Sequence, residues 1–459
     1  MKPVLFSKGY RAWLLTILLL TNALNLADRQ GIAVVAQAIK LDLKLTDAQM
    51  GIIQGLGFAI FYTLLGLPLA RMAERMSRTR IVAASLAIFG VMVSLCGSAQ
   101  GFWRLLLFRV GVGVGDAGFG PPVASLIGDH YPRDRRASAM SIIWLGAPLG
   151  VVAGSTFAGW MAENVSWRAA FVGIGAPALL VALIAFLTLR DPPRGMSDEI
   201  SIAGPPPSMW EVLRFLLSKR SVRHTLIGCA LAATAMNAIG QFLGQFFVRA
   251  YHMGFAEAGR LLGFIAALAM SSGLALGGFG VDWASRFDQR WFVWGPAIGL
   301  VLATPLFAIA FAAPVVAVGI GVLTAAHVVL FIYFTPTLAI AQNMVSANMR
   351  ASSAFVVSVV LGLVGIGLGP TLIGALSDAF AGRAFLMGDF ATLCPGGAAP
   401  VNAVSTLQEA CSGASSLGIR HALIAMSMLF AWAGIHYFMA GRDLRRDLET
   451  HYQLPRAAE

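Results

Sequence analysis

The sequence predicts an all-α membrane protein in which twelve transmembrane helices form two pseudo-symmetric six-helix bundles. Three observations support this fold class. Of the 459 residues, 58% are hydrophobic and only 12% are charged, whereas about a quarter of the residues in a soluble domain are charged. Twelve apolar runs reach the roughly 20 residues that a membrane-spanning helix needs. Sequence matches at shifts of 208 to 215 residues indicate two halves in parallel orientation.

Short polar segments separate the twelve apolar runs, and two of these separations are narrow. GSAQGFW divides the third run from the fourth, and Pro314 divides the ninth from the tenth. The first run is too long for a cleavable signal peptide and lacks a small-residue cleavage site, so we expect it to be the first span. The predicted spans are 12–37, 47–70, 80–97, 103–128, 137–161, 169–189, 223–249, 256–280, 290–311, 314–341, 350–377 and 418–440.

The basic residues predict the orientation in the membrane. If the N-terminus is cytoplasmic, 23 of the 33 Lys and Arg residues fall in cytoplasmic segments, 8 fall in external loops, and Arg29 and Arg109 lie within spans. Cytoplasmic loops of membrane proteins carry such an excess. We therefore expect both termini in the cytoplasm and the chain in a bacterial inner membrane. The net charge of +11 then indicates contact with anionic membrane lipids and not with nucleic acid.

A polar segment near the middle of the chain predicts the boundary between the two halves. It begins with a Pro-rich stretch and continues with MWEVLRFLLSKR, whose pattern predicts an amphipathic helix lying on the inner leaflet. The predicted organisation is an N-terminal bundle at 1–190, a cytoplasmic linker at 191–222, a C-terminal bundle at 223–441 and a cytoplasmic tail at 442–459.

Charged and glycine residues carry the internal repeat. A shift of 208 residues aligns AQMGIIQG with AEAGRLLG, and it places Glu74 on Asp282 and Arg78 on Arg286. Internal repeats of this kind are typical of secondary transporters. A shift of 215 residues aligns three glycines of each half, which are Gly150, Gly154 and Gly159 with Gly365, Gly369 and Gly374.

Two loop motifs resemble those of the major facilitator superfamily. ARMAERMSRTR, at 70–80, resembles its inner-loop signature Gly-x-x-x-Asp-Arg-x-Gly-Arg-Arg, with Glu74 in the place of the aspartate. GFGVDWASRFDQR, at 278–290, resembles the second-half copy, with Gly278 and Asp282 in place. The resemblance implies the superfamily's fold of two six-helix bundles.

Within that superfamily the chain is most similar to spinster-type transporters. NLADR in the first span resembles their Asn-x-x-Asp-Arg. RVGVGVGDAGFGPP in the fourth resembles their Arg-x-x-x-Gly-x-Gly-Glu-Ala motif, with Asp116 in the place of the glutamate. WRAAF and RDPPRG match the pattern after spans five and six. The resemblance implies export of an amphipathic lipid, such as a sphingoid or a lysophospholipid, by alternating access.

Charged side chains within the first and fourth spans are the main candidates for binding substrate and protons. Asp28 lies near mid-bilayer, where a charge is costly unless it is paired or hydrated. Arg109 and Asp116 lie two turns apart on one face of a helix. The resemblance implies that spans one and four both line the transport cavity. We therefore expect one cluster of Asn25, Asp28, Arg29, Arg109 and Asp116.

Within this cluster, we expect Asp28 to exchange its partner and its proton while an arginine receives an anionic head group. Burial raises the pKa of a carboxyl group and a neighbouring arginine lowers it, so a change of partner would load and release the proton. A static network of ion pairs that braces the N-terminal half is the alternative.

The spans of the C-terminal half contain few polar residues. Asn237, Gln241 and Gln245 recur every four residues on span seven, and His327 lies near the middle of span ten. Asn237, Gln241 and His327 are further candidate substrate residues, although a lone histidine is more often a packing residue. A polar N-terminal half and an apolar C-terminal half predict an amphipathic cavity.

Charged residues at the predicted cytoplasmic edge form a candidate gate. Glu74, Arg75 and Arg78 follow span two, and Asp282 and Arg286 follow span eight. An acid at such a position accepts hydrogen bonds from a helix N-terminus and pairs with arginine. We expect these bonds to hold the outward-open state. Topology alone is the other interpretation, because basic loops also mark the cytoplasmic side.

Two of the four cysteines, Cys394 and Cys411, share one polar loop on the predicted external side. A disulfide between them and two free thiols are both open from the sequence.

The leading interpretation is a secondary active or facilitative transporter, working as a monomer, with proton linkage through Asp28. No enzymatic activity, cofactor or metal is expected, because the sequence shows no metal-ligand spacing and no nucleophile triad. The glycine-rich GVGVGDAG looks like a phosphate-binding loop but lies inside a span. One alternative is a proton-coupled symporter of small organic anions, since first-span Asn-x-x-Asp-Arg variants also occur in that branch of the superfamily. A second is a membrane receptor that does not transport.

Overall fold

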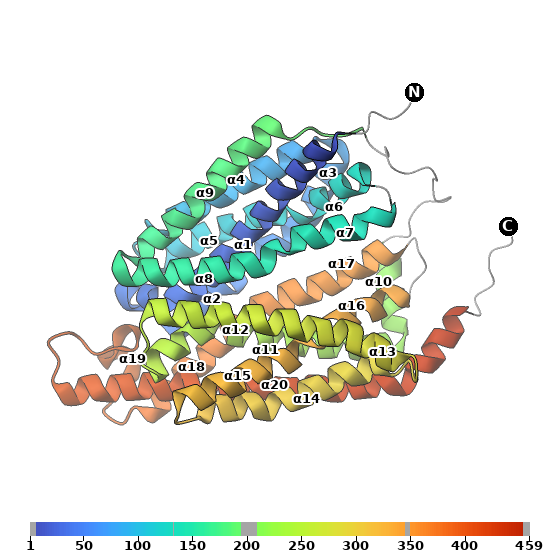
Figure 1. Ribbon diagram of the computed structural model, residues 1–459. Coiled ribbons are helices and arrows are strands. Elements are labelled where there is room, and N and C mark those ends of the chain that lie inside the picture. The colour runs from blue at the N-terminus through green and yellow to red at the C-terminus, as the bar shows by residue number, and fades with distance from the viewer. Residues whose placement is uncertain (1–5, 132, 194–208, 345–348, 453–459) are drawn as a thin grey trace, which may run out of the picture. The chain divides into compact units, whose positions relative to one another are not determined.

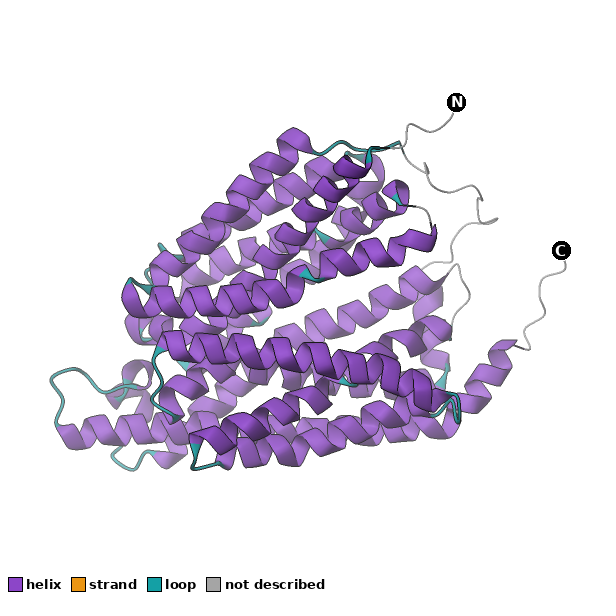
Figure 2. Ribbon diagram, in the orientation of Figure 1, coloured by secondary structure: helices purple, strands orange, loops and turns teal. Residues whose placement is uncertain are grey.

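The computed structural model describes residues 6–131, 133–193, 209–344 and 349–452. These residues form helices joined by short loops, and none of them lies in a strand (Figures 1 and 2). The helices of the N-terminal half are α1 (Lys8–Leu43), α2 (Asp47–Gln54), α3 (Leu56–Arg75), α4 (Arg78–Cys96), α5 (Phe102–Ala117), α6 (Gly120–His130), α7 (Arg133–Trp144), α8 (Gly146–Asn164) and α9 (Trp167–Thr188). Those that follow are α10 (Met209–Ser218), α11 (Arg220–Ala250), α12 (Phe255–Ala275), η1 (Leu276–Gly280), α13 (Val281–Ser285), α14 (Trp291–Ala312), α15 (Val316–Phe331), α16 (Phe334–Asn343), α17 (Arg350–Val359), η3 (Val360–Leu368), α18 (Gly369–Ala384), α19 (Phe390–Leu393), η4 (Pro395–Gly397) and α20 (Ser405–Tyr452).

The helices confirm the predicted all-α class. Within the described ranges, eleven helical stretches are long and apolar enough to cross a membrane. Helix α1 is not among these eleven, although its 36 residues exceed the length of a span. Its central part carries Asn22, Asn25, Asp28 and Arg29, which lower its hydropathy. With α1 the helices correspond to the twelve predicted spans, while the side of the membrane on which the termini lie stays a prediction.

The two narrow separations lie where the sequence predicts them. Helix α4 ends at Cys96 before α5 begins at Phe102, and α14 ends at Ala312, two residues before Pro314. The last helix is longer than expected, because α20 covers Ser405–Tyr452 where the predicted span is 418–440.

Several spans consist of two helical segments. The second span breaks at Gly55, between α2 and α3, where the backbone adopts φ −107° and ψ −92°. The fourth breaks at Gly118, between α5 and α6. A Cβ atom at Gly118 would lie 1.9 Å from Ser85 Oγ of α4, so only glycine allows this approach.

The chain divides into two compact units, each built from several stretches of sequence. Unit 1 consists of Met1–Ser201, Gly240–Ala267 and Pro370–Ile419, and unit 2 consists of Ile202–Ile239, Leu268–Gly369 and Arg420–Glu459. Helices α11, α12 and α20 are therefore shared between the units, and α18 begins in unit 2 with Gly369 and continues in unit 1. The predicted boundaries at 190, 222 and 441 stay predictions.

In unit 1, close packing fixes the position of α1. A Cβ atom at Gly150 of α8 would lie 2.1 Å from the carbonyl oxygen of Ala23, and one at Gly154 would lie 2.3 Å from the Cα atom of Ala27. Small residues let membrane helices approach in this way. The contact holds the neighbouring residue, Asp28, in a fixed position along α8.

In unit 2, aromatic residues fill the interior between helices. Phe307 of α14 stacks on Phe430 of α20, with ring centroids 5.3 Å apart. Helix α10 lies in the segment predicted to form an amphipathic helix. It buries Val212 and Leu216 and exposes Trp210, as an amphipathic pattern requires.

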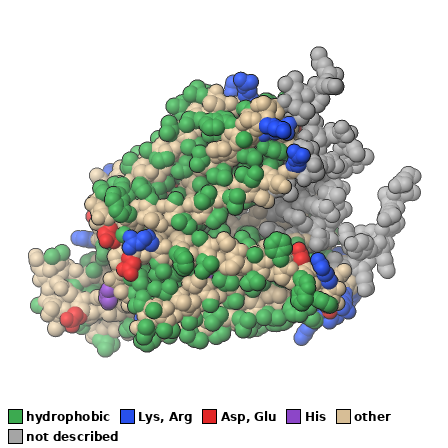
Figure 3. Space-filling view, in the orientation of Figure 1, with side chains coloured by type: hydrophobic (Ala, Val, Ile, Leu, Met, Phe, Trp, Pro, Cys, Tyr) green, Lys and Arg blue, Asp and Glu red, His purple; other side chains and the backbone are tan. Residues whose placement is uncertain are grey.

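In the face that Figure 3 shows, acidic and basic side chains lie toward the helix ends, and hydrophobic side chains cover most of the surface between them. This distribution is expected when lipid surrounds the middle of the helices and water surrounds their ends.

Candidate functional site

The five charged and polar residues predicted on spans one and four come together in unit 1. Arg109 Nη1 of α5 donates to Asp28 Oδ2 of α1 at 2.7 Å. Asp116 of α5 accepts a bond from Asn25 Nδ2 at 2.6 Å and one from Arg29 Nη2 at 3.2 Å. We call this set the Asp28 cluster. It holds two acids and two bases, so its net charge is zero when all four are ionised.

The observed pairs agree with the helical repeat of α1. Asn25 and Arg29 lie four residues apart, hence on the same face of α1, and both reach Asp116. Asp28 lies about 100° around the helix from Arg29 and reaches Arg109. Arg29 therefore pairs with a residue on another helix and not with its neighbour Asp28.

The two ion pairs differ in their exposure. The side chains of Asp28 and Arg109 are 0% and 2% exposed, whereas those of Arg29 and Asp116 are 22% and 10% exposed. The cluster therefore has a sealed pair and a pair that solvent reaches. A ligand can contact Arg29 without first displacing Asp28.

Aromatic residues of α3, which the sequence analysis missed, pack against the arginines. The guanidinium carbon of Arg29 lies 4.4 Å from the ring centroid of Phe58 and 5.5 Å from that of Tyr62. Arg109 lies 5.9 Å from the same Phe58 ring. Such contacts stabilise a cation and orient its planar group. The only signal in the sequence is the four-residue spacing of Phe58 and Tyr62 on span two.

The Asp28 cluster leaves hydrogen-bonding capacity unused. Asp28 Oδ1 and Asn25 Oδ1 are buried and have no hydrogen-bond partner among the described residues. An ionised carboxylate accepts up to about four hydrogen bonds, and Asp28 accepts one. Its second oxygen therefore has unused capacity to accept a hydrogen bond.

A second buried cluster in unit 1 centres on Asp47, at the start of α2. Asp47 Oδ1 accepts from Lys40 Nζ and Arg249 Nη2, each at 2.6 Å. Asp47 Oδ2 accepts from Arg249 Nη1 and Ser377 Oγ, each at 2.7 Å. Gln37 accepts from Arg249 Nε at 2.5 Å. This Asp47 cluster joins α1, α2, α11 and α18.

The sequence analysis missed the Asp47 cluster. Lys40 and Arg249 are two of the eight basic residues that the predicted topology assigns to external loops, and Asp47 is the first residue of the predicted span 47–70. In the structure the three side chains are at most 4% exposed. Gln245, part of the predicted polar stripe on span seven, belongs to this cluster, because its Oε1 accepts from Arg249 Nη2.

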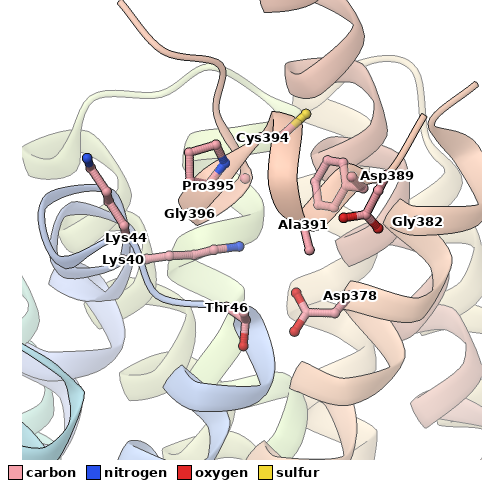
Figure 4. A pocket seen from close by; sticks show the side chains of 12 residues that line it. Lys40, Lys44, Thr46, Asp378, Gly382, Asp389, Ala391, Cys394, Pro395 and Gly396 are labelled. Carbon is pink, nitrogen blue, oxygen red and sulfur yellow. The ribbon is translucent and has the colours of Figure 1, made fainter. Parts of the chain in front are cut away.

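A cavity of about 260 Å³ lies beside the Asp47 cluster. Figure 4 shows Lys40 extending toward Pro395 and Gly396, with Thr46 and Asp378 facing the same space. A disulfide joins Cys411 to Cys394, the residue that precedes Pro395. Cys411 lies within α20 and not in a loop, because α20 begins at Ser405.

Of the predicted gate residues, Arg78 is the most tightly held. It is 1% exposed, its Nε donates to Asp191 Oδ1 at 2.8 Å, and its Nη1 contacts Asp129. Its Nη2 also donates to the carbonyl oxygen of Pro192 at 2.7 Å. These bonds join α4, α6 and the segment after α9 within unit 1.

The other predicted gate residues are not held in buried contacts like those of Arg78. Arg75, Asp282 and Arg286 are exposed, and the side chain of Glu74 lies outside the described part of the structure. In unit 2, Asp288 pairs with Arg445 of α20 at 2.8 Å. A hydrogen bond from the backbone amide of Arg290 and the pairing with Arg445 lower the pKa of Asp288 below its ordinary value. A gate at these positions stays a prediction.

The polar candidates of the C-terminal half bond mainly to their own helices. Asn237 Nδ2 donates to the carbonyl oxygen of Ala233 at 2.9 Å. His327 Nδ1 lies 2.9 Å from the carbonyl oxygen of Leu323, and its ring packs edge-on against Phe307. Gln241 Oε1 is buried with no partner among the described residues. Asn237 and His327 therefore have the contacts of packing residues.

Comparisons with known proteins all match this chain to transporters of one superfamily. A family model described as Major Facilitator Superfamily matches residues 18–370. The chain is 32% identical to a bacterial homolog of the human lysosomal transporter spinster, solved in an inward-facing and unoccupied conformation. That match has a TM-score of 0.86 and covers 96% of this chain and 99% of the other.

Two further relatives cover most of the chain. An MFS-type efflux pump of Mycolicibacterium smegmatis is 29% identical over 80% of this chain and 85% of its own length. A hexuronate transporter of Bacillus subtilis is 27% identical over 84% of this chain and 93% of its own length.

Proposed function

Because the chain belongs to the Major Facilitator Superfamily and is a spinster-like member of it, we propose that it exports an amphipathic, lipid-like substrate by alternating access, with proton linkage through Asp28. The chain is a multi-pass integral membrane transporter and not an enzyme. The identity of the substrate, the direction of transport, the coupling to protons and a monomeric state belong to the proposal. The arrangement of the Asp28 cluster is the observation that carries it.

Arg29 is the residue best placed to receive an anionic head group. It is the most exposed of the four charged residues in the Asp28 cluster. Its bond to Asp116 is 3.2 Å long, longer than the 2.7 Å bond between Arg109 and Asp28. A phosphate or carboxylate can replace Asp116 as its partner, because both anions match the guanidinium geometry. Phe58 and Tyr62 hold the guanidinium plane during the exchange.

Asp28 is the residue proposed to carry the proton. Removing one partner of a buried ion pair leaves the other charge uncompensated, at a cost of about 3–5 kcal/mol. Arg109 can therefore leave Asp28 only if Asp28 takes up a proton or Arg109 finds another anion. Asp116, displaced from Arg29 by a head group, lies on the same helix as Arg109 and supplies such an anion. Binding of the head group and protonation of Asp28 are thereby linked.

The polar residues of spans seven and ten favour a lipid-like substrate over a sugar. Asn237 and His327 use hydrogen-bonding atoms within their own helices. A sugar requires many partners for its hydroxyl groups, because unpaired polar groups are costly when buried. An acyl chain requires none.

A symporter of small organic anions is the second candidate. The relative in Bacillus subtilis is named a hexuronate transporter, and Arg29 with its aromatic neighbours would also bind a carboxylate. A receptor that binds without transport is the third candidate. The three differ in which solute moves and in whether any solute moves.

Flux into or out of proteoliposomes tests the proposal. We would measure a fluorescent sphingoid base, a fluorescent lysophospholipid and radiolabelled glucuronate, each with and without a pH gradient. Wild type, Asp28→Asn and the control Asp42→Asn, an exposed acid paired with Arg168, would be compared. We expect gradient-dependent flux of a lipid that Asp28→Asn alone loses.

Other outcomes separate the candidates. Flux of glucuronate but not of lipid supports the symporter. Binding without flux supports the receptor. Equal gradient dependence in wild type and Asp28→Asn would remove Asp28 as the proton carrier.

A further inference from the structure

An acid of α18 holds the start of α2. Asp378 Oδ1 accepts from the backbone amide of Asp47 at 3.0 Å, and Asp378 Oδ2 accepts from that of Ala48 at 2.8 Å. The first amides of a helix have no partner within the helix and carry its positive dipole end. A carboxylate from another helix therefore caps α2. In Figure 4 the Asp378 carboxylate lies opposite Thr46, the residue that precedes α2.

An acid of α8 holds the start of α12 in the same way. Glu163 Oε2 accepts from the backbone amide of Ala256 at 2.7 Å. The same oxygen lies 2.7 Å from the position that a Cβ atom would take at Gly254. The glycine before α12 therefore makes room for the carboxylate.

These two contacts are related by the internal repeat of the sequence. The shift of 208 residues places Ala48 on Ala256, and the shift of 215 places Glu163 on Asp378. Each half thus supplies one capped helix start and one capping acid. The repeat aligns a glutamate with an aspartate, in helices of differing length. The two acids are therefore not an identical match when the halves of the sequence are compared.

Glycines that follow the same repeat bring the helices together beside each contact. A Cβ atom at Gly374 would lie 2.1 Å from the carbonyl oxygen of Asp47, so α18 meets the backbone of α2. A Cβ atom at Gly159 would lie 2.4 Å from the carbonyl oxygen of Phe255, so α8 meets the backbone of α12. Gly159 and Gly374 are equivalent at the shift of 215 residues.

We infer that the Asp378–α2 and Glu163–α12 contacts are two pseudo-symmetric latches that close the predicted external end, and that both must break when that end opens. This inference rests on the proposed function, since alternating access requires an end that opens. Each latch joins one helix of the N-terminal half of the chain to one helix of the C-terminal half. A hydrogen bond that a helix-start amide donates to a carboxylate is strong while formed and is lost completely when the helices separate.

The two latches are of unequal strength. Asp378 is half-buried and caps α2 with two bonds, next to the saturated Asp47 cluster. Glu163 is exposed and makes one such bond. Water screens and competes with exposed charge–dipole contacts. The α8–α12 side therefore opens first, and the α2–α18 side opens last.

Distances between spin labels test the latches without relying on transport. One labelled pair, Leu41→Cys with Arg383→Cys, reports on the α18 side, and the other, Asn164→Cys with Arg260→Cys, reports on the α12 side. All four residues are exposed, whereas the native Cys96 and Cys229 are buried and Cys394 and Cys411 are bonded to each other. Labels therefore attach only at the introduced cysteines.

Asp378→Asn and Glu163→Gln remove the charge of each latch with little change in size. Matched controls are Asp389→Asn, an exposed acid near α18, and Glu257→Gln, an exposed acid in the first turn of α12. We expect the long-distance population to rise roughly tenfold in Asp378→Asn and about threefold in Glu163→Gln, as the loss of a charged hydrogen bond predicts. Asp378→Glu should restore most of the short-distance population.

Distance distributions that match those of the controls in both variants would overturn the latches. Glu163 is exposed, so Glu163→Gln is expected to fold and gives a result even if Asp378→Asn does not fold. Longer distances without any flux would support the latches and overturn the proposed transport. Flux of substrate with unchanged distances would support transport and overturn the latches.

Discussion

Two buried carboxylates of unit 1, Asp28 and Asp47, have opposite surroundings. Asp47 accepts four hydrogen bonds, from Lys40, Arg249 and Ser377. Asp28 accepts one, from Arg109, and its other oxygen has no partner among the described residues. Both side chains are at most 3% exposed. The two carboxylates are therefore equally buried, and they differ in the number of hydrogen bonds that they accept.

The difference indicates two kinds of role. A saturated carboxylate has no free oxygen for a proton, and every change of its partners breaks a bond. Asp47 is therefore suited to hold helices in one arrangement. Asp28 has one such bond, and a change of its partner breaks fewer bonds. This difference is consistent with the proposal that Asp28, and not Asp47, changes state during transport.

The largest effect is expected from Asp47→Asn. This change leaves Lys40 and Arg249 buried near a neutral side chain, so we expect the free energy of unfolding to fall by about 3–5 kcal/mol. Thermal unfolding in detergent measures it. The control Asp42→Asn, in an exposed ion pair, should cost about 0–1 kcal/mol. If both variants melt at the wild-type temperature, the Asp47 cluster does not hold the helices.

A smaller loss of stability is expected from Asp28→Asn, together with a change in transport. The change leaves one buried cation, Arg109, beside a neutral side chain, whereas Asp47→Asn leaves two, so we expect a cost at the lower end of the same range, about 3 kcal/mol. Gradient-dependent flux should disappear in the same variant. A stability loss as large as that of Asp47→Asn would make the two carboxylates equivalent and remove the comparison.

Arg29→Lys should weaken substrate binding while preserving the charge. A lysine cannot form two parallel bonds to a phosphate or carboxylate and stacks less well on Phe58. We expect KM to rise roughly tenfold, which corresponds to about 1.4 kcal/mol. A concentration series of the transported solute measures it. The control Arg104→Lys makes the same substitution at an exposed arginine outside the Asp28 cluster and should leave KM unchanged.

Phe58→Leu should have the smallest effect. It keeps an apolar side chain of somewhat smaller volume beside Arg29 and Arg109 but removes the ring over both guanidinium groups. Loss of a partly exposed cation–π contact costs about 0.5–1 kcal/mol, which is a two- to fivefold rise in KM. An unchanged KM would mean that the ring only fills space, and Arg29 alone would then define the site.

The sequence predicts the members of the Asp28 cluster because charged residues are conspicuous within apolar runs. Asp28, Arg29, Arg109 and Asp116 interrupt spans that are otherwise hydrophobic. The resemblance implies that spans one and four both line the transport cavity, and on that ground one cluster is predicted; the structure brings the four side chains together. Which acid pairs with which base depends on the rotation of α1 against α5, which helical periodicity alone does not fix.

The Asp47 cluster escapes the sequence analysis for the opposite reason. Lys40, Asp47 and Arg249 lie at span ends, where charged residues are ordinary. Only the packing of α1, α2, α11 and α18 buries them. The partners of Arg78, which are Asp129 and Asp191, are hidden in the same way.

The polar character of α1 has a consequence for how the protein enters the membrane. Arg109 is made 81 residues after Asp28, so at roughly 5–20 residues per second the carboxylate waits several seconds for its partner. During that time Asp28 and Arg29 belong to a helix too polar to count among the eleven apolar stretches. We therefore expect integration of α1 into the bilayer to be completed only when α5 is made, and a chain truncated before Arg109 should leave its first helix poorly inserted.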